Sequence, residues 1–219
     1  MEEIETLAKG YKFESMLDQT PSQVIILAKK NPKSRASVGP LEKVFLKIGL
    51  DKDSMASIKH EYKLLSKLSH PHILKPQSHK KGKSEGGKYR RLSYSFQQNG
   101  DLWSLTEKMD GLGENLARVY GLQILSAIDY LHSKRIAHRD LKLDNVIVKD
   151  DLDVAIIDFD LAYESSNLTS VPNEKVKLHG TKGYFPPELW EFQELVEEDP
   201  LRTFNYLKAD AFAFGVMMF

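Results

Sequence analysis

The chain has 219 residues, 41% of them apolar, which is enough for one large hydrophobic core or two small ones. Its 31 basic and 31 acidic side chains balance to zero, which argues against nucleic acid as a main partner, and it has no cysteine for disulfides or thiolate zinc sites. The N-terminus lacks the apolar region of a secretory signal, and no apolar stretch could span a bilayer. We therefore expect no membrane partner and a cytoplasmic or nuclear location.

The first hundred residues predict strands and one helix. Short strands are predicted at residues 24–28, 44–48 and 92–96. A helix is predicted from about Ser54 to Leu68, with Asp53 as its N-cap. Residues 79–91 are basic and contain glycine, which predicts a solvated loop at the tip of a hairpin.

The pattern changes to helical near residue 99. Asp101 is predicted to cap a short helix that carries Leu102, Trp103 and Leu105. A longer helix follows at residues 116–132, with apolar side chains on most of its sides. Such a helix is expected to lie inside a domain rather than on its surface. The boundary near residue 98 therefore separates a sheet lobe from a helical lobe.

The most informative segment is residues 138–145, which read HRDLKLDN. Phosphoryl transfer needs a carboxylate to orient and deprotonate the attacking hydroxyl, and an oxygen ligand for magnesium close by. Asp140 and Asn145 could supply both from one tight loop. The alternative is a polar turn between a helix and a strand.

Two short apolar strands follow this segment, at residues 146–148 and 154–157, joined by an acidic turn. A hairpin of these strands would bring Asp158 back beside the loop that carries Asp140. Residues 158–160 read DFD. Aspartate tolerates left-handed backbone better than most residues, so a tight turn can form at Asp160.

These segments resemble, in order, the motifs of the eukaryotic-type protein kinase family of the serine/threonine type. Residues 138–145 match the catalytic-loop pattern H-R-D-L-x-x-x-N at every specified position, and DFD resembles D-F-G. Residues 180–188, GTKGYFPPE, resemble the end of an activation segment. Residues 210–216, DAFAFGV, resemble the start of the central helix of the large lobe, where Asp210 would anchor the catalytic loop. Taken alone, Asp210 could also be a helix N-cap.

The resemblance covers residues 11–219 and implies an α+β, two-lobed kinase fold. Residues 11–98 would form a small β-rich, nucleotide-binding lobe with one helix. Residues 99–219 would form part of the helical, catalytic large lobe, and we expect the chain to be truncated at its C-terminus. The implied activity is transfer of the γ-phosphoryl of ATP to a hydroxyl of a protein substrate, with magnesium as the metal.

The family also implies a role for each matching residue. Asp140 would be the base, Lys142 would steady the transferred phosphoryl, and Thr181 would help to receive the substrate. Arg139 would bind a negative charge on the activation segment. Metal ligands would be Asn145 and Asp158. Contacts to ATP would come from Val24, Lys47, Glu61, Ser95, Gln97 and Ile147.

The charge for Arg139 has two candidate sources in the sequence. One is a phosphate on a hydroxyl upstream of Thr181, for which the candidates are Ser165, Ser166, Thr169 and Ser170. The other is the carboxylate of Glu174, which is favoured because it needs no upstream enzyme.

The sequence pattern itself indicates that Glu61 has a partner, because this residue lies inside the apolar stripe of its predicted helix. A buried unpaired carboxylate is costly, and the family pairs this residue with the strand lysine, here Lys47. The alternative is a glutamate that reaches out to solvent.

Several positions depart from the family. Leu17, Gln19 and Ser22 stand where three glycines let backbone amides approach the phosphates. Phe45 replaces the usual alanine against adenine, and the large Tyr94 falls at the gatekeeper position before the hinge. Three interpretations therefore remain open. They are an active kinase domain, a pseudokinase acting as a binding or scaffold module, and a fragment that lacks the helices covering its last apolar residues.

Overall fold

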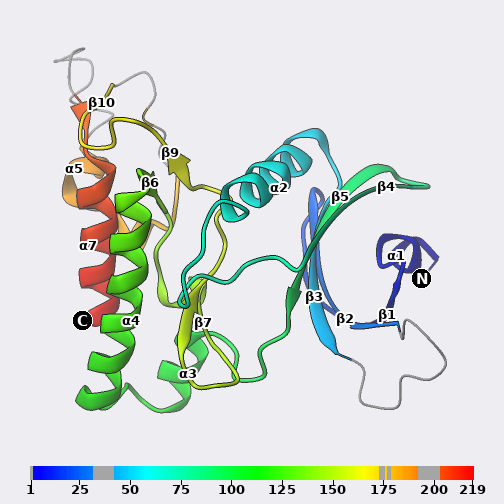
Figure 1. Ribbon diagram of the computed structural model, residues 1–219, viewed down its shortest axis with the longest axis horizontal. Helices are drawn as coiled ribbons and strands as arrows, with labels where there is room; N and C mark the ends of the chain where they lie inside the picture. The colour runs from blue at the N-terminus through cyan, green and yellow to red at the C-terminus, as the bar shows by residue number, and fades with distance from the viewer. Residues whose placement is uncertain (1, 32–41, 173–175, 177–178, 192–202) are drawn as a thin grey trace. The chain divides into compact units, whose positions relative to one another are not determined.

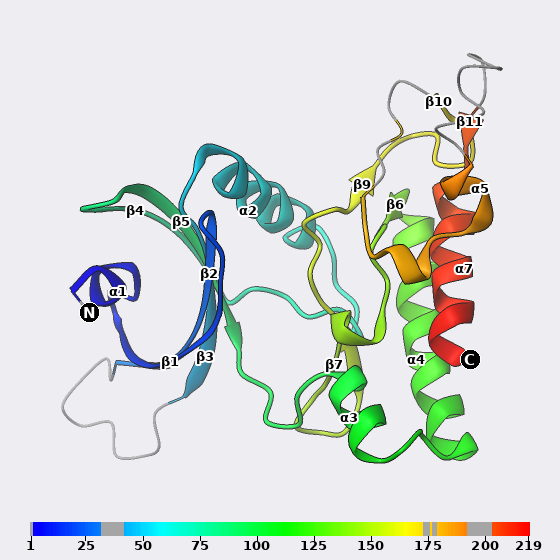
Figure 2. The same cartoon turned by 180° about the vertical axis from the view of Figure 1, so that it is seen from behind.

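The computed structural model describes residues 2–31, 42–172, 176, 179–191 and 203–219 (Figure 1; Figure 2). The chain divides into two compact units, residues 1–69 with 74–96 and residues 70–73 with 97–219. The chain thus passes from the first unit to most of the second between Phe96 and Gln97, whereas the sequence predicts this boundary near residue 98.

The first unit is built on a five-stranded antiparallel sheet in the order β1-β2-β3-β5-β4. Its strands are β1 (Tyr11–Gln19), β2 (Gln23–Lys30), β3 (Lys43–Gly49), β4 (Ser78–Ser84) and β5 (Gly87–Ser95). Buried and half-buried residues alternate along β2, because successive side chains of a strand point to opposite faces of the sheet. One face of this strand is therefore completely covered.

Helix α1 (Glu2–Leu7), which the sequence does not predict, covers that face. Leu7 and Ala8 share one hydrophobic core with apolar residues of β2 and β3. The Arg91 side chain, 1% exposed, donates to the carbonyl oxygens of Leu7 at 2.5 Å and Lys9 at 3.2 Å. A cation at the C-terminal end of a helix is favourable, so Arg91 helps to hold α1 on the sheet.

Helix α2 (Lys52–Leu65) lies on the opposite side of the sheet from α1 (Figure 1). Its N-cap is Asp51, so the prediction of Asp53 is wrong. Asp51 Oδ1 accepts from the Ser54 backbone N–H at 2.8 Å, and Ser54 Oγ accepts from the Asp51 N–H at 3.2 Å. This reciprocal capping box requires a partner three residues after the cap, and Ser54 stands in that position for Asp51.

The basic segment 79–91 is a pair of strands, β4 and β5, rather than a loop, and its turn is confined to residues 85 and 86. The exposed lysines of β4 stand at the edge of the sheet, where charge discourages pairing with another chain. Gly82 makes room for the Tyr89 ring, since a Cβ at Gly82 would lie 2.2 Å from it. The glycine and the basic residues therefore belong to a hairpin of two paired strands and not to a solvated loop.

In its described residues, the second unit combines helices with three pairs of short strands. The helices are α3 (Leu102–Lys108), α4 (Glu114–Ser133), α5 (Pro187–Trp190) and α7 (Tyr206–Met218), with the 3₁₀ turns η1 (Leu143–Asn145) and η3 (Lys182–Tyr184). The strand pairs are β6 (Ile136–Ala137) with β9 (Tyr163–Glu164), β7 (Val146–Val148) with β8 (Val154–Ile156), and β10 (Val171–Pro172) with β11 (Thr203–Phe204). Asp101 caps α3 as predicted. Helices α4 and α7 run side by side (Figure 1; Figure 2).

Helix α4 is buried on one side only, which corrects the prediction of a fully internal helix. Ile124, Ile128 and Leu131 are buried. Val119 and Leu122, by contrast, are 50% and 62% exposed within the part of the chain that the structure describes. Strands β6 and β8 and helix α7 contact α4, and the helical period places those two residues away from the buried face. Among the described residues, no helix combines the length and the apolarity needed to cross a bilayer.

Candidate active site

The loop that carries Asp140 is anchored through its backbone by Asp210 of α7. The 2%-exposed Asp210 carboxylate accepts from the backbone N–H groups of His138 and Arg139, both at 2.9 Å. It also lies 3.0 Å from His132 Nε2 on α4. The N-cap of α7 is Asn205, so the alternative of Asp210 as a helix cap is wrong. A buried carboxylate with three such partners fixes the loop relative to two helices.

The side chain of His138 joins this loop to the segment after β8. The Asp140 N–H donates to His138 Nδ1 at 3.3 Å, and His138 Nε2 lies 3.0 Å from the Ile157 carbonyl oxygen. The ring packs edge-on against Phe159 at 4.8 Å. Through His138, the catalytic loop and the segment that carries Asp158 are held together.

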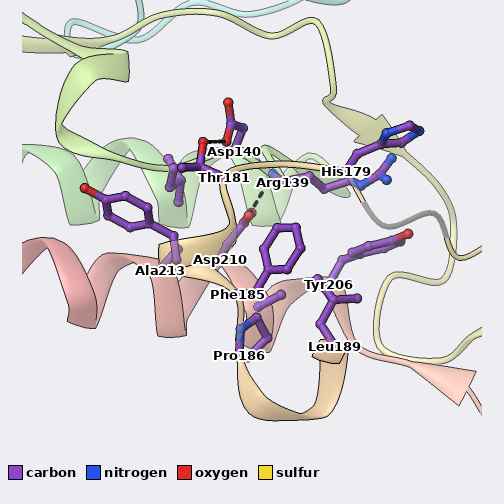
Figure 3. A pocket seen from close by; sticks show the side chains of 13 residues that line it. Arg139, Asp140, His179, Thr181, Phe185, Pro186, Leu189, Tyr206, Asp210 and Ala213 are labelled. Carbon is purple, nitrogen blue, oxygen red and sulfur yellow. Dashed lines mark hydrogen bonds between the residues drawn. The ribbon is translucent and has the colours of Figure 1, made fainter. Parts of the chain in front are cut away.

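The Asp140 carboxylate lies at the centre of a hydrogen-bond network. Thr181 Oγ1 donates to its Oδ1 at 2.8 Å (Figure 3). Asn145 Nδ2 donates to its Oδ2 at 3.1 Å. Asn145 Nδ2 also donates to the Asp140 carbonyl at 2.8 Å, and Lys142 Nζ lies 3.8 Å from Oδ2. Three of the residues that the motifs single out therefore surround the expected base.

A small pocket lies beside this network, between the catalytic loop, residues 179–189 and α7 (Figure 3). Gly180, at φ +117°, lets the chain pass close to the loop, because a Cβ there would lie 2.6 Å from the Arg139 carbonyl oxygen. Phe185, Pro186 and Leu189 supply the apolar wall. The glycine that begins the GTKGYFPPE segment is thus required by the close approach that brings Thr181 to Asp140.

Arg139 is held by two aromatic rings that the sequence analysis did not single out. Its guanidinium lies 4.6 Å from the ring centroid of Tyr206 and 5.8 Å from that of Tyr163. Burial lowers the pKa of the Arg139 guanidinium, although nearby Tyr206 and Asp210 act in the opposite direction. Glu174, the suggested charge partner of Arg139, lies outside the described residues.

The predicted hairpin of β7 and β8 is present and brings Asp158 beside the catalytic loop. The Ile157 N–H donates to the Asn145 carbonyl at 2.9 Å, so the chain just before Asp158 is bonded to Asn145. The left-handed residue is Asp158 itself, at φ 63°, and Asp160 is not in that region of backbone space. The expected turn at Asp160 is present, closed by the hydrogen bond from the Ala162 N–H to the Phe159 carbonyl at 3.1 Å, and it forms without left-handed backbone at Asp160.

In the first unit, Lys47 of β3 forms the expected ion pair with Glu61 of α2. Lys47 Nζ donates to Glu61 Oε2 at 3.0 Å, and the two side chains are 7% and 1% exposed. The alternative of a solvent-exposed glutamate is therefore excluded. Tyr94 Oη donates to the other oxygen, Oε1, at 2.7 Å, an interaction that the sequence analysis missed.

The strand register corrects the assignment of Val24. Val24 pairs with Ile48 and is buried on the α1 side of the sheet, whereas Ile25 pairs with Lys47 and shares its face. A shift of one residue moves a side chain to the other face, and the local sequence of β2 does not reveal which apolar residue is aligned with the lysine. Ile25 therefore replaces Val24 beside Lys47.

The remaining predicted contact residues are placed as follows. Phe45, on the same face as Lys47, stacks on Tyr94 with ring centroids 4.7 Å apart and planes 10° apart. Ser95 ends β5, while Gln97 Oε1 accepts from the Asp150 N–H at 3.1 Å in the second unit. Ile147 is buried within β7. The side chain of Gln97 is thus used to hold the turn after β7.

Comparison with known proteins agrees with this geometry. The chain matches the protein kinase domain family over residues 41–219, which include the ion pair, the catalytic loop and the anchoring aspartate. The chain belongs to the protein kinase family. Within a kinase domain, the anchored loop and the segment at Thr181 are the places where catalysis and substrate binding are organised.

Several kinases resemble this chain in sequence. The serine/threonine-protein kinase PKH2 of Saccharomyces cerevisiae is 32% identical over 96% of this chain and 19% of its own length. The human 3-phosphoinositide-dependent protein kinase 1 is 29% identical over 83% of this chain and 31% of its length. The serine/threonine-protein kinase RAD53 of Saccharomyces cerevisiae is 34% identical over 62% of this chain. The chain spans less than a third of the length of these kinases.

Motif residues are also contacted by side chains that belong to no motif, among them Tyr94, Tyr163 and Tyr206. A signal existed for Tyr206, which precedes Asp210 by four residues and so lies on the same face of α7. For Tyr94 and Tyr163 no local signal existed, because their partners Glu61 and Arg139 are far away in the sequence.

Proposed function

We propose that this chain transfers the γ-phosphoryl of ATP to a serine or threonine hydroxyl of a protein substrate. The observation that carries the proposal is the hydrogen bond from Thr181 Oγ1 to Asp140 Oδ1, at 2.8 Å. It places an aliphatic hydroxyl against the carboxylate that the family uses as base, in a network that also contains Lys142 and Asn145. A substrate hydroxyl could donate to the same carboxylate.

The residues of the second unit would perform the transfer step. Asp140 would orient the substrate hydroxyl and accept its proton, which is the role of a general base. Lys142, whose ammonium lies 3.8 Å from the Asp140 carboxylate, would offset negative charge that develops on the transferred group. Asp210 would keep Asp140 and Lys142 in place by fixing the loop backbone.

The donor atoms available fit the magnesium ion that the family uses. Asn145 donates through Nδ2 to Asp140, which leaves its Oδ1 as a ligand, and Asp158 adds a carboxylate from the adjoining segment. Hard oxygen donors of this kind suit magnesium, which would neutralise phosphate oxygens when bound. In the first unit, Lys47 would bind the phosphates, with Glu61 orienting its ammonium.

A second candidate function is that of a pseudokinase, a binding or scaffold module without catalysis. The observation that favours it is the Phe45–Tyr94 stack, which adds bulk to the face of the sheet that carries Lys47. The lack of any glycine in residues 17–23 also weakens the expected cover of a nucleotide. Under either function we propose a protein partner and a cytoplasmic or nuclear location.

The deciding experiment measures ATP binding to the purified chain with and without magnesium, followed by transfer of labelled γ-phosphate to a generic protein. Label on serine or threonine, lost in Asp140→Asn, supports the proposal. Magnesium-dependent binding without transfer supports the pseudokinase. A folded chain that neither binds ATP nor transfers phosphate overturns the proposed transfer activity and supports the pseudokinase.

A further inference from the structure

We propose that Tyr94 is a positioning residue that fixes the Glu61 carboxylate, so that the Lys47–Glu61 pair is in place before any nucleotide binds. The role of that pair rests on the proposed function. The hydrogen bond of Tyr94 does not, since Tyr94 Oη lies 2.7 Å from Glu61 Oε1 in the structure.

Each oxygen of the Glu61 carboxylate has its own donor. Lys47 Nζ donates to Oε2 from β3, and Tyr94 Oη donates to Oε1 from β5. All three residues are at most 5% exposed, so water competes little for these bonds. A single donor would leave the carboxylate free to rotate, whereas two donors from neighbouring strands define the plane of the group.

The Tyr94 ring is itself held in place by the sheet. Phe45 and Tyr94 are directly paired across β3 and β5, and their rings stack with 10° between planes. A stacked ring has little freedom to move its hydroxyl away from Glu61. The stacked Phe45 and Tyr94 rings therefore support Glu61 rigidly. Their bulk also reduces the open space on the sheet face beside Lys47.

The electrostatic need for a second donor follows from burial. A buried ion pair loses the hydration of both charges, and one contact between them seldom compensates for this loss. The phenol adds a charge-assisted hydrogen bond to the carboxylate without adding charge. Removal of the hydroxyl would leave Oε1 without this donor and would weaken the hold of Glu61 on Lys47.

The test uses Tyr94→Phe, which keeps the ring and its stacking partner. The matched control is Tyr89→Phe on the same strand, because Tyr89 is also buried and loses only a hydroxyl bond to the Thr6 carbonyl, at 3.3 Å. In the nucleotide-free chain, acetylation of Lys47 by an activated ester is followed by mass spectrometry. We expect Tyr94→Phe to accelerate it about tenfold and Tyr89→Phe to leave it unchanged, since bonds to charged groups are stronger than neutral ones.

A cycle with Glu61→Gln separates positioning from general loosening. In that background Tyr94→Phe should change the acetylation rate by less than about twofold, because the carboxylate is already absent. The proposal is overturned if Lys47 is acetylated at the same rate in Tyr94→Phe as in the natural chain. It is also overturned if Tyr89→Phe accelerates the acetylation as much as Tyr94→Phe does.

Steady-state kinetics give an independent readout. Tyr94→Phe should raise KM for ATP about tenfold with little change in kcat, since phosphate binding by Lys47 is shared by the ground state and the transition state. An unchanged KM together with unchanged labelling would remove Tyr94 from the site. If the natural chain transfers no phosphate, the proposed function fails, while the labelling experiment still decides the role of Tyr94.

Discussion

The catalytic loop of the second unit and the Lys47 face of the first unit differ in how they depart from the family. Around Asp140 every polar motif residue is retained, and each is held by neighbours such as Asp210, Asn145 and Thr181. On the sheet, the lysine and glutamate are retained, but the surrounding apolar and glycine positions carry larger residues.

The difference reflects what each region must satisfy. A buried polar network tolerates little change, because each lost partner leaves another group unsatisfied. An apolar face can exchange small residues for large ones if neighbouring rings repack, as Phe45 and Tyr94 do. The chemistry of transfer and the fit of the nucleotide can therefore diverge separately in one domain.

The largest effect is expected at the centre of the network. Asp140→Asn should lower turnover by about a hundredfold or more while ATP affinity changes little, since loss of a general base costs roughly 10²–10⁴ in rate. Phosphate transfer and ATP titration would measure this. The matched control is Asp144→Asn on the same loop, whose side chain is exposed. Near-normal turnover in Asp140→Asn would remove the base assignment.

The metal ligands provide the next test of the second unit. Asp158→Ala should abolish the tightening of ATP binding by magnesium, because only the neutral Asn145 oxygen would remain as a ligand. Calorimetry with and without magnesium checks this. Asp151→Ala removes an exposed carboxylate paired with Lys149 and should leave the magnesium dependence intact. Magnesium dependence that persists in Asp158→Ala would place the metal elsewhere.

A smaller effect, of opposite sign, is expected on the sheet. Phe45→Ala should tighten ATP binding about threefold, because relief of crowding outweighs the looser hold on the Tyr94 ring that follows from loss of the stack. Phe13→Ala is the control, since Phe13 packs against the core that contains α1. Weaker binding in Phe45→Ala would mean that its ring stacks on adenine instead of crowding it.

The smallest effects concern the activation segment. Because Arg139 already contacts the Tyr163 and Tyr206 rings, Thr169→Ala and Ser170→Ala should each change turnover by less than about twofold. Glu174→Gln should reduce turnover several-fold if that carboxylate supplies a standing charge, on the order of one surface ion pair. Inactivation by Thr169→Ala or Ser170→Ala, with Glu174→Gln silent, would instead indicate activation by phosphorylation.

Much of the site follows from local patterns, whereas the errors concern strand pairing and burial. The loop at 138–145, the β7–β8 hairpin and the Lys47–Glu61 pair are visible in sequence because their spacing is short or their motif is dense. The sequence places Val24 on the wrong face because the partner strand β3 lies outside the segment that is read. It predicts a loop at residues 79–91 because lysine and glycine are depleted in strands, although β4 and β5 pair with each other within this segment. Helix α4 was placed inside the domain because its apolar residues do not reveal which side is covered.

The groups proposed for phosphoryl transfer can be read from the sequence, because they stand at the fixed spacings of dense motifs. How those groups are held is visible only in the folded chain. Tyr94 reaches Glu61 from 33 residues away, and the Tyr206 ring lies 4.6 Å from the guanidinium of Arg139 on the catalytic loop. Such contacts depend on strand register and helix packing, which are set by the burial of many residues together and not by any one segment.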